Sequence, residues 1–293
     1  MKDTLVKAIA HTGRIRITVA STTHLVEEAH QRHQTWPTAS AALGRALGMA
    51  AIMGSDLKND DEKISIVIKG DGPLGDVVVE GRNNGTVRGY VNHPDVYLVN
   101  DQNKLDVSKA VGKGSLTVTR HTGLKVDYTS SVELQTGEIG DDFAYYYFMS
   151  EQIPSAISVG VLVGEDSSIL SAGALVIEVM PEATDADIDI IEDVVEHLKP
   201  ISQIIHEGMD ARELALALFQ DVEILDEKEL SFECTCSREQ MSATLSMLDV
   251  SELKTFIDED DGCEMICHYC NTHYQFTPED IAEVIHQKIS HVN

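Results

Sequence analysis

"CTCSREQ" at residues 234–240 and "CEMICHYCNTHYQF" at residues 263–276 together contain all five cysteines of this 293-residue chain. Cys234 and Cys236 form a C-x-C pair, and Cys267 and Cys270 form a C-x-x-C pair after 30 intervening residues. Two closely spaced thiolate pairs supply the four soft ligands that tetrahedral zinc prefers. The pattern therefore predicts one Zn²⁺ ion, bound by Cys234, Cys236, Cys267 and Cys270.

The residues around the two pairs indicate how the pairs would meet. Residues 237–260 have a helical pattern, "CHYCN" is typical of a tight knuckle, and "THYQF" predicts a short returning strand. Because four thiolates complete the shell, we expect His268 and His273 to be exposed residues of this hairpin. A thioredoxin-type redox motif would need a βαβ setting, which is missing here. The spacing also fits an iron–sulfur cluster, but zinc is the more usual occupant.

Cys263 is a fifth thiol outside this four-cysteine pattern. Since four ligands suffice, we expect it to be a near-surface residue and to remain a free thiol. The neighbouring Asp261 and Glu264 should raise its pKa and slow its reaction with oxidants. The alternative is that Cys263 competes for Cys267 or Cys270 on oxidation.

Composition and termini restrict the class of protein. Hydrophobic residues at 43% and charged residues at 24% are ordinary for a globular chain. The first 20 residues resemble neither a signal nor a transit peptide, and no apolar run approaches the ~18 residues of a membrane span. We therefore expect a cytoplasmic protein with no membrane partner. In a reducing compartment, clustered cysteines favour a metal or redox role over structural disulfides.

The net charge of −27 is unevenly distributed. Residues 181–293 carry 27 acidic and 6 basic side chains, whereas residues 1–180 carry 22 and 16. Such a surface repels a phosphate backbone, so we expect no nucleic-acid partner. High negative charge also keeps a protein in solution if it must expose apolar surface.

The chain is predicted to be an α+β protein in three parts. Residues 1–180 form an N-terminal mixed α/β sheet domain, residues 181–230 an acidic helical linker, and residues 231–293 a small C-terminal zinc-binding domain. In the linker, apolar residues recur at helical spacing from Ile188 to Leu198, and Asp210 with Glu213 forms a capping box.

Within the N-terminal domain, residues 32–58 hold the main helix, with Thr35 as its cap and Pro37 in its first turn. Residues 64–91 predict a three-stranded antiparallel meander. Further strands are expected at 114–120 and 125–134, a helix near 141–152, and a buried hairpin of 156–164 with 169–180 that turns at Glu165–Ser167.

Several motif matches fail on their context. "GDGPLG" at 70–75 fits a dinucleotide fingerprint, but that motif must open a helix and a strand pattern follows here. The acidic series from Asp185 to Glu196 lacks the glycine of a calcium loop and has a helical period. "HEGMD" at 206–210 has Asp210 where a zinc protease has its second histidine. We therefore expect no active site in the first 230 residues, and no enzyme.

Six stretches together carry a resemblance to a known family. They are "RHQTWPTASAALGR" (32–45), "GDGPLGDVVVEG" (70–81), "VRGYVNHP" (87–94), "GEIGDDF" (137–143), "SAGALVIEVMP" (171–181) and the closing C-x-C…C-x-x-C. In this order they resemble the heat shock protein 33 family, also called the 33 kDa chaperonin. The family comprises redox-regulated holdase chaperones of the bacterial cytosol. The resemblance runs from the first residues to about residue 285.

The resemblance implies a mechanism. The four cysteines bind zinc when reduced, and the chaperone is then folded and idle. Oxidation forms the disulfides Cys234–Cys236 and Cys267–Cys270, zinc leaves, and the C-terminal domain unfolds. The linker then loosens and exposes apolar surface that holds unfolding client proteins without ATP during oxidative and heat stress, and the active state is a homodimer. The alternative function is an enzyme or binding module in residues 1–180 with a purely structural zinc tail.

Overall fold

The structure is a computed structural model that describes residues 2–59, 61–123 and 126–290. It divides into two compact units, residues 1–233 and residues 234–293. Both α-helices and β-sheets are present, which confirms the predicted α+β class. Within the described ranges, no helix is both long enough and apolar enough to cross a membrane.

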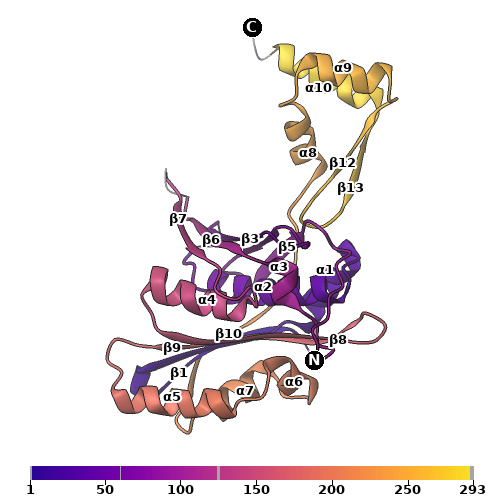
Figure 1. The fold of residues 1–293 in the computed structure, drawn as a ribbon. Coiled ribbons are helices and arrows are strands. Elements are labelled where there is room, and N and C mark those ends of the chain that lie inside the picture. The colour runs from indigo at the N-terminus through magenta and orange to yellow at the C-terminus, as the bar shows by residue number, and fades with distance from the viewer. Residues whose placement is uncertain (1, 60, 124–125, 291–293) are drawn as a thin grey trace. The chain divides into compact units, whose positions relative to one another are not determined.

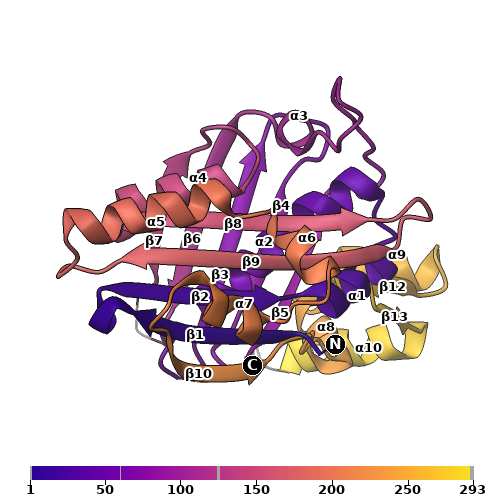
Figure 2. The same ribbon diagram turned by 90° about the horizontal axis from the view of Figure 1, so that it is seen from below.

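The first unit contains two sheets (Figures 1 and 2). The five-stranded sheet has the order β10-β1-β2-β9-β8, and the six-stranded sheet has the order β11-β5-β4-β3-β6-β7. The strands of the first sheet are β1 (Thr4–Ala10), β2 (Ile15–Ser21), β8 (Ser155–Val163), β9 (Ile169–Val179) and β10 (Glu223–Glu229). Those of the second are β3 (Lys63–Gly70), β4 (Val77–Gly81), β5 (Thr86–Val91), β6 (Gly114–His121), β7 (Tyr128–Glu133) and β11 (Ser231–Phe232).

Helices fill the space between the two sheets (Figure 1). The helices of this part of the chain are α1 (Thr23–His33), α2 (Pro37–Gly54), α3 (Val107–Val111) and α4 (Gly140–Tyr146). Helix α2 contacts both sheets and is buried over nearly its whole length, because small and apolar residues occupy every side of it. Pro37 begins α2 as predicted. The predicted cap Thr35 is wrong: Trp36 precedes the helix, and the Thr35 hydroxyl hydrogen-bonds that of Ser40 at 2.7 Å.

Most of the predicted strands of this unit are confirmed. Strands β3, β4 and β5 form the antiparallel meander, and β6 and β8–β9 lie where expected. The strand expected at 125–134 is found as β7, although its first position lies outside the described residues. The hairpin turn contains Ser167 with φ 70°. The hairpin is not buried throughout, because β8 is an edge strand and mostly half-exposed.

The glycine-rich stretch at 70–75 is a turn, as its context predicted. The Gly72 N–H donates to the Val111 carbonyl and the Leu74 N–H to the Ala110 carbonyl. Strand β4 follows two residues later. In a nucleotide site, backbone N–H groups of this loop would bind a phosphate. Here those of Gly72 and Leu74 donate to carbonyls of α3 instead.

Three short helices lie on the outer face of the five-stranded sheet (Figure 1). They are α5 (Asp185–His197), α6 (Ile201–His206) and α7 (Ala211–Leu218). Each helix contributes buried apolar residues to the face of β1, β2 and β9: Ile191 from α5, Ile201, Ile204 and Ile205 from α6, and Ala211, Leu214, Ala215 and Leu218 from α7. The capping box of Asp210 and Glu213 at the start of α7 is confirmed.

Helix α6 approaches the sheet at two glycines that face each other, Gly160 of β8 and Gly173 of β9. A Cβ atom at Gly160 would lie 2.8 Å from the Ser202 Oγ, and one at Gly173 would lie 2.3 Å from the Ile205 Cδ1. These separations are too short for real atoms, so the helix packs directly against the backbone of the sheet.

The expected helical linker does not continue to residue 230. Residues 223–229 form β10, which pairs antiparallel with β1 over six register pairs (Figure 2). The physical reason is that β1 would otherwise present an unpaired edge, and backbone pairing outweighs the low strand propensity of acidic residues. Asp187, in the calcium-like series, caps α5: its carboxylate accepts hydrogen bonds from the N–H and hydroxyl of Thr184 and contacts His11 at 2.8 Å.

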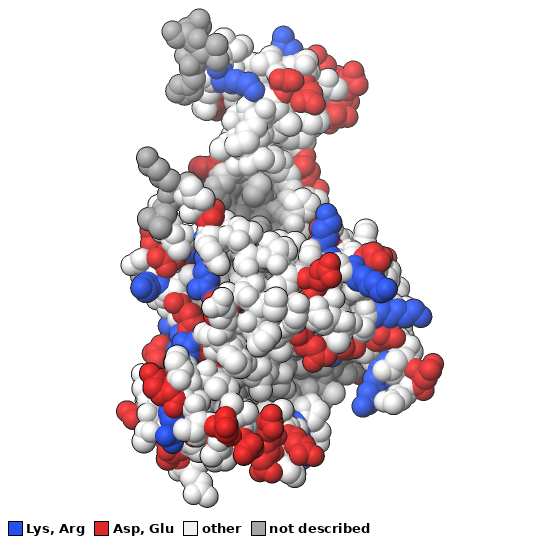
Figure 3. Space-filling model, turned by 60° about the vertical axis from the view of Figure 1, so that its left-hand side comes forward, with Lys and Arg blue, Asp and Glu red and all other residues white. Residues whose placement is uncertain are grey.

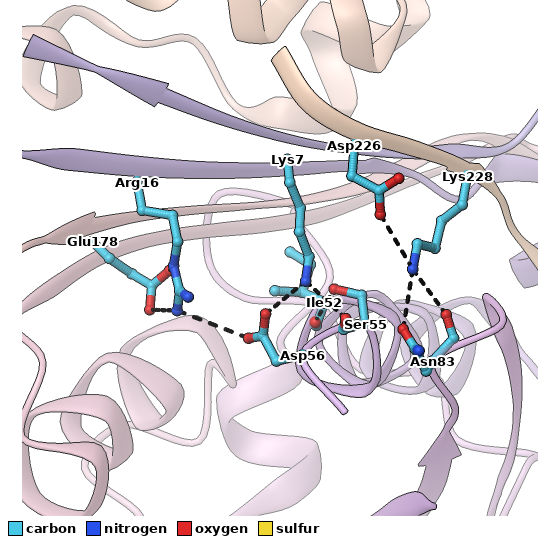
Figure 4. Close-up of polar contacts among 9 residues, drawn as sticks. All are labelled: Lys7, Arg16, Ile52, Ser55, Asp56, Asn83, Glu178, Asp226 and Lys228. Atoms are coloured by element: carbon cyan, nitrogen blue, oxygen red, sulfur yellow. Dashed lines mark hydrogen bonds and ion pairs between the residues drawn. The ribbon is translucent and has the colours of Figure 1, made fainter. Parts of the chain in front are cut away.

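Charged side chains are paired inside the first unit. Figure 4 shows Lys7 of β1 pointing toward the end of α2, where it contacts Asp56 at 2.7 Å. In the other sheet, Glu80 is 5% exposed and contacts Lys63 at 2.8 Å and Arg88 at 2.6 Å. Burial alone would raise the pKa of Glu80, but the hydrogen bonds and charges of these two cations lower it to about 2.

The second unit has two helices, a hairpin and a final helix. They are α8 (Arg238–Leu245), α9 (Val250–Asp258), β12 (Cys263–Ile266), β13 (His273–Phe276) and α10 (Pro278–Ser290). The predicted helical segment 237–260 is therefore two helices, and the returning strand is confirmed. Its core consists of five buried apolar residues: Leu245, Leu253, Phe276, Ile281 and Val284.

Candidate metal centre

The hairpin of the second unit positions two of the five cysteines. Cys267 and Cys270 lie in the turn between β12 and β13. The Cys267 N–H donates to the Thr272 carbonyl at 3.0 Å, and the Asn271 N–H donates back to the Cys267 carbonyl at 2.7 Å. Asn271 adopts φ 56°, a left-handed conformation that asparagine tolerates well. This turn is the predicted knuckle, and it aims both sulfurs to one side.

The C-x-C pair precedes α8, and Ser237 caps this helix by accepting a hydrogen bond from the Gln240 N–H at 3.3 Å. The chain thereby brings Cys234 and Cys236 to the knuckle. The four Sγ atoms of Cys234, Cys236, Cys267 and Cys270 all lie within 4.8 Å of one another. The structure thus gathers the four cysteines that the spacing singled out.

The geometry of this cluster fits a tetrahedral metal ion. The Cys234 and Cys267 sulfurs are 3.7 Å apart, and those of Cys236 and Cys270 are 3.4 Å apart. A tetrahedron with Zn–S bonds of about 2.3 Å has sulfur–sulfur edges of about 3.8 Å. Cys267 and Cys270 are buried and the other two are half-buried, so an ion held here is largely screened from water.

The cluster favours a cation on electrostatic grounds as well. Burial raises the pKa of Cys267 to about 12. Burial also opposes ionisation of Cys270, but hydrogen bonds from Thr272 and from Cys236 lower its pKa to about 7. Four thiolates so close together would repel one another, and a divalent cation would remove that repulsion.

Two hydrogen-bonding residues of this centre were missed in the sequence. The Tyr274 hydroxyl lies 3.1 Å from the Cys236 sulfur, and the Thr272 hydroxyl lies 3.2 Å from the Cys270 sulfur. Hydrogen bonds of this kind orient and tune metal ligands. The alternation of "THYQF" held a usable signal, because Thr272, directly before β13, and Tyr274 are two residues apart, and residues at this spacing in an extended chain face the same side.

Cys263 lies outside the group of four sulfurs. It is in β12 opposite Phe276 and packs against the apolar core of the second unit. Its pKa is raised, as predicted, but burial is the cause and not the neighbouring carboxylates. His268 and His273 are exposed as predicted, and His273 contacts Glu264 at 3.1 Å.

Fold and site together define a class of protein: a two-sheet α+β unit followed by a 60-residue unit that encloses a four-cysteine centre able to hold a metal ion. The family model described as "Hsp33 protein" matches residues 3–277. The chain belongs to the Hsp33 family.

Curated relatives and a solved structure agree with this assignment. The 33 kDa chaperonin of Staphylococcus carnosus is 42% identical over 290 residues, which is 98% of each chain. That of Halalkalibacterium halodurans is 43% identical over 285 residues, covering 96% of this chain and 98% of the relative. The crystal structure of the 33 kDa chaperonin (heat shock protein 33 homolog) from Thermotoga maritima has a TM-score of 0.93 and 34% identity, covering 99% of this chain and 100% of that one. The family places the chain among chaperones. The curated relatives of this chain are named as chaperonins and not as enzymes.

Proposed function

We propose that this chain is a zinc-dependent, oxidation-activated, ATP-independent holdase of the bacterial cytoplasm. The observation that carries the proposal is the four-sulfur cluster in a unit whose described residues include a core of five buried apolar side chains. A unit of this size has a net stability of only about 3–5 kcal/mol from its core. A structural zinc ion contributes about 10–16 kcal/mol, so its loss unfolds such a unit.

Zinc is the metal that the ligand set favours. Four thiolates in a tetrahedral arrangement are typical of zinc, and the sulfur–sulfur distances of 3.7 and 3.4 Å fit its bond length. Cys234, Cys236, Cys267 and Cys270 would each supply one sulfur. A zinc ion bound by these sulfurs would keep the thiolates unreactive and the unit folded.

Oxidation is proposed to join nearest neighbours in sequence, Cys234 with Cys236 and Cys267 with Cys270. Each disulfide forms as two thiols lose two protons and two electrons to a peroxide, which is reduced to water. All four sulfurs are within reach of one another, so distance does not select the pairing. Short loops close at a lower entropic cost than long ones, and this favours the two short loops once the unit has unfolded.

In this proposal, the three predicted parts of the chain have different roles on oxidation. Residues 231–293 form the switch, residues 181–230 form the linker that detaches from the sheet, and residues 1–180 remain folded. Detachment would uncover the apolar outer face of β1, β2 and β9, on which the linker helices lie. That face is proposed to hold unfolding client proteins under oxidative and heat stress, with a homodimer as the active state.

Treatment with hydrogen peroxide at mildly raised temperature tests this function. Zinc release is followed with a chromogenic chelator, and client protection is followed as light scattering of a heat-labile protein. We expect release and protection together, and the double variant Cys267→Ser, Cys270→Ser should bind zinc weakly. Cys263→Ser is the matched control, because it removes a thiol without touching the centre. Zinc that stays bound in peroxide, or release without protection, would leave the alternative of a purely structural zinc tail.

A further inference from the structure

Strand β10 covers an edge of the five-stranded sheet that is well built for strand addition. Its neighbour β1 is apolar, and Leu5, Val6 and Ala8 are all fully buried. The other side of β1 is paired in regular register with β2. Strand β1 is therefore held in place by β2 and by its buried side chains. The backbone N–H and C=O groups on its other edge, where β10 now lies, need a partner.

By contrast, β10 is a poor occupant of this edge. Glutamate or aspartate fills four of its seven positions, and five of the seven residues are exposed. The ladder with β1 is interrupted by a register shift that passes over Leu225, which is 55% exposed. On the core side, Ile224 is the residue of this strand that packs against the apolar face. Acidic residues have low strand propensity and repel one another, so the pairing is weak for its length.

The side chains that hold β10 in place are few and mostly at the surface. Lys228 donates to the Asn83 carbonyl at 3.0 Å and to its Oδ1 at 3.1 Å, and it lies 3.3 Å from Asp226 (Figure 4). The ion pair of Lys2 with Glu229 is exposed on both sides. Exposed ion pairs contribute little to stability because water screens them.

The covalent position of β10 connects it to the metal centre. After β10, the Leu230 N–H donates to the Asp3 carbonyl, and the Glu233 N–H donates to the Val87 carbonyl. The next residue is Cys234. One continuous stretch, residues 223–233, thus pairs with both sheets and ends directly at the first metal ligand, so an unfolded C-terminal unit leaves this stretch free to fray from that end.

We propose that β10 is an internal substitute for client, and that an extended apolar segment of an unfolding protein adds to the edge of β1 as an antiparallel strand once β10 has left. This rests on the proposed function. A client strand with alternating apolar residues would continue the row of Val6 and Ala8 on the outer face, where β10 offers Ile224. Backbone pairing supplies the affinity without a sequence requirement, which suits a protein that receives many clients.

Hydrogen exchange of the oxidised full-length protein tests the proposal, with reduced, carboxymethylated α-lactalbumin as the permanently unfolded client. The β1 amides that face β10 should lose protection on oxidation. They should regain it when client is added, by about tenfold or more in exchange rate. Client that docks only through side chains on the face would leave these amides exchanging as before, and that result would overturn the proposal.

Variants of β10 give a second, independent measurement. Glu223→Thr with Asp226→Thr raises the strand propensity of β10, so client should bind about five- to tenfold more weakly, with zinc release unchanged. Lys228→Ala should act in the opposite direction. The control Glu192→Gln with Glu196→Gln removes the same two charges from the exposed side of α5 and should bind client as the unmodified protein does.

These measurements distinguish a failure of the proposed function from a failure of the strand-addition proposal. If the oxidised protein releases zinc and holds no client, the proposed function is wrong and this inference falls with it. If client is held while the β1 amides stay unprotected, or while the threonine variant binds client as tightly as the control, this inference alone is wrong.

Discussion

Replacing Gly173 by alanine should loosen the linker while the metal centre stays intact. The added Cβ would lie 2.3 Å from the Ile205 Cδ1 and 2.8 Å from the Ala20 carbonyl oxygen. The Ala20 carbonyl belongs to the backbone of β2 and cannot give way, so the strain falls on the Ile205 and Ile201 side chains, and α6 has to move off the sheet. Overpacking of this kind costs about 1–3 kcal/mol. In a docked–released equilibrium, that corresponds to an increase of about 5- to 150-fold in the released fraction.

The assay is hydrogen exchange of the reduced, zinc-loaded protein. Residues 201–218 should exchange faster in Gly173→Ala, by the same factor as the released fraction, while β3 and β4 keep their protection. The oxidant concentration needed for activation should fall as well. Gly140→Ala is the matched control, because the added Cβ there meets only a Val159 methyl group at 3.3 Å. Equal protection of residues 201–218 in both variants would show that close approach at the glycines does not hold the linker.

Four further predictions concern the metal centre and the core. Chelating the metal should unfold residues 234–293, and the unfolding should be seen as a loss of helical circular dichroism. Zinc contributes about 10–16 kcal/mol to the stability of this unit, as much as burial of its five core side chains (about 8–15 kcal/mol). Retained helix after chelation would contradict this. Tyr274→Phe removes a hydrogen bond to a ligand sulfur, so peroxide should release zinc several-fold faster in a stopped-flow assay, and an unchanged rate would argue against that role. Cys263→Ser should activate normally, and peptide mapping that finds a dominant 263–267 or 263–270 disulfide would refute this. Glu80→Gln should lower the free energy of unfolding by ~2 kcal/mol at pH 7; because the folded pKa is about 2 and the ordinary value 4.5, this difference should shrink as pH falls from 4.5 toward 2, and a pH-independent difference in denaturant titrations would show another cause.

Local patterns in the sequence predicted what local physics controls. The two cysteine pairs, the capping box of Asp210, the meander and the hairpin turn each depend on residues a few positions apart, and the structure has them where expected. Helix periodicity also located α5. These features need no knowledge of distant partners.

Features that depend on distant partners were missed or wrong. The assignment of 223–229 as helical was wrong because its strand form is imposed by β1, more than 200 residues earlier in the chain. The exposure of β8 follows from its place at an edge, which the strand pattern does not encode. Tyr274 was overlooked because its contact is with Cys236, 38 residues away. Sheet order and hydrogen bonds to the ligand sulfurs are tertiary properties.

Helix α5 is the loosely attached part of the linker, whereas α6 and α7 supply most of its buried contacts with the sheet. Helix α5 has 13 residues, and Ile191 is its one fully buried apolar side chain, while Ile188, Ile190 and Val195 are about 40% exposed. Acidic side chains gather over this part of the unit (Figure 3), so like charges oppose its compaction. A helix of this length is marginal on its own in water, and α6 and α7 are shorter still. Helix α5 therefore gains little stability from docking, and the docked state of α6 and α7 depends on their buried contacts with the sheet. Under the proposed function, loss of structure beyond Cys234 removes the anchor at one end of residues 223–233, and release of the linker then starts from that end and from α5.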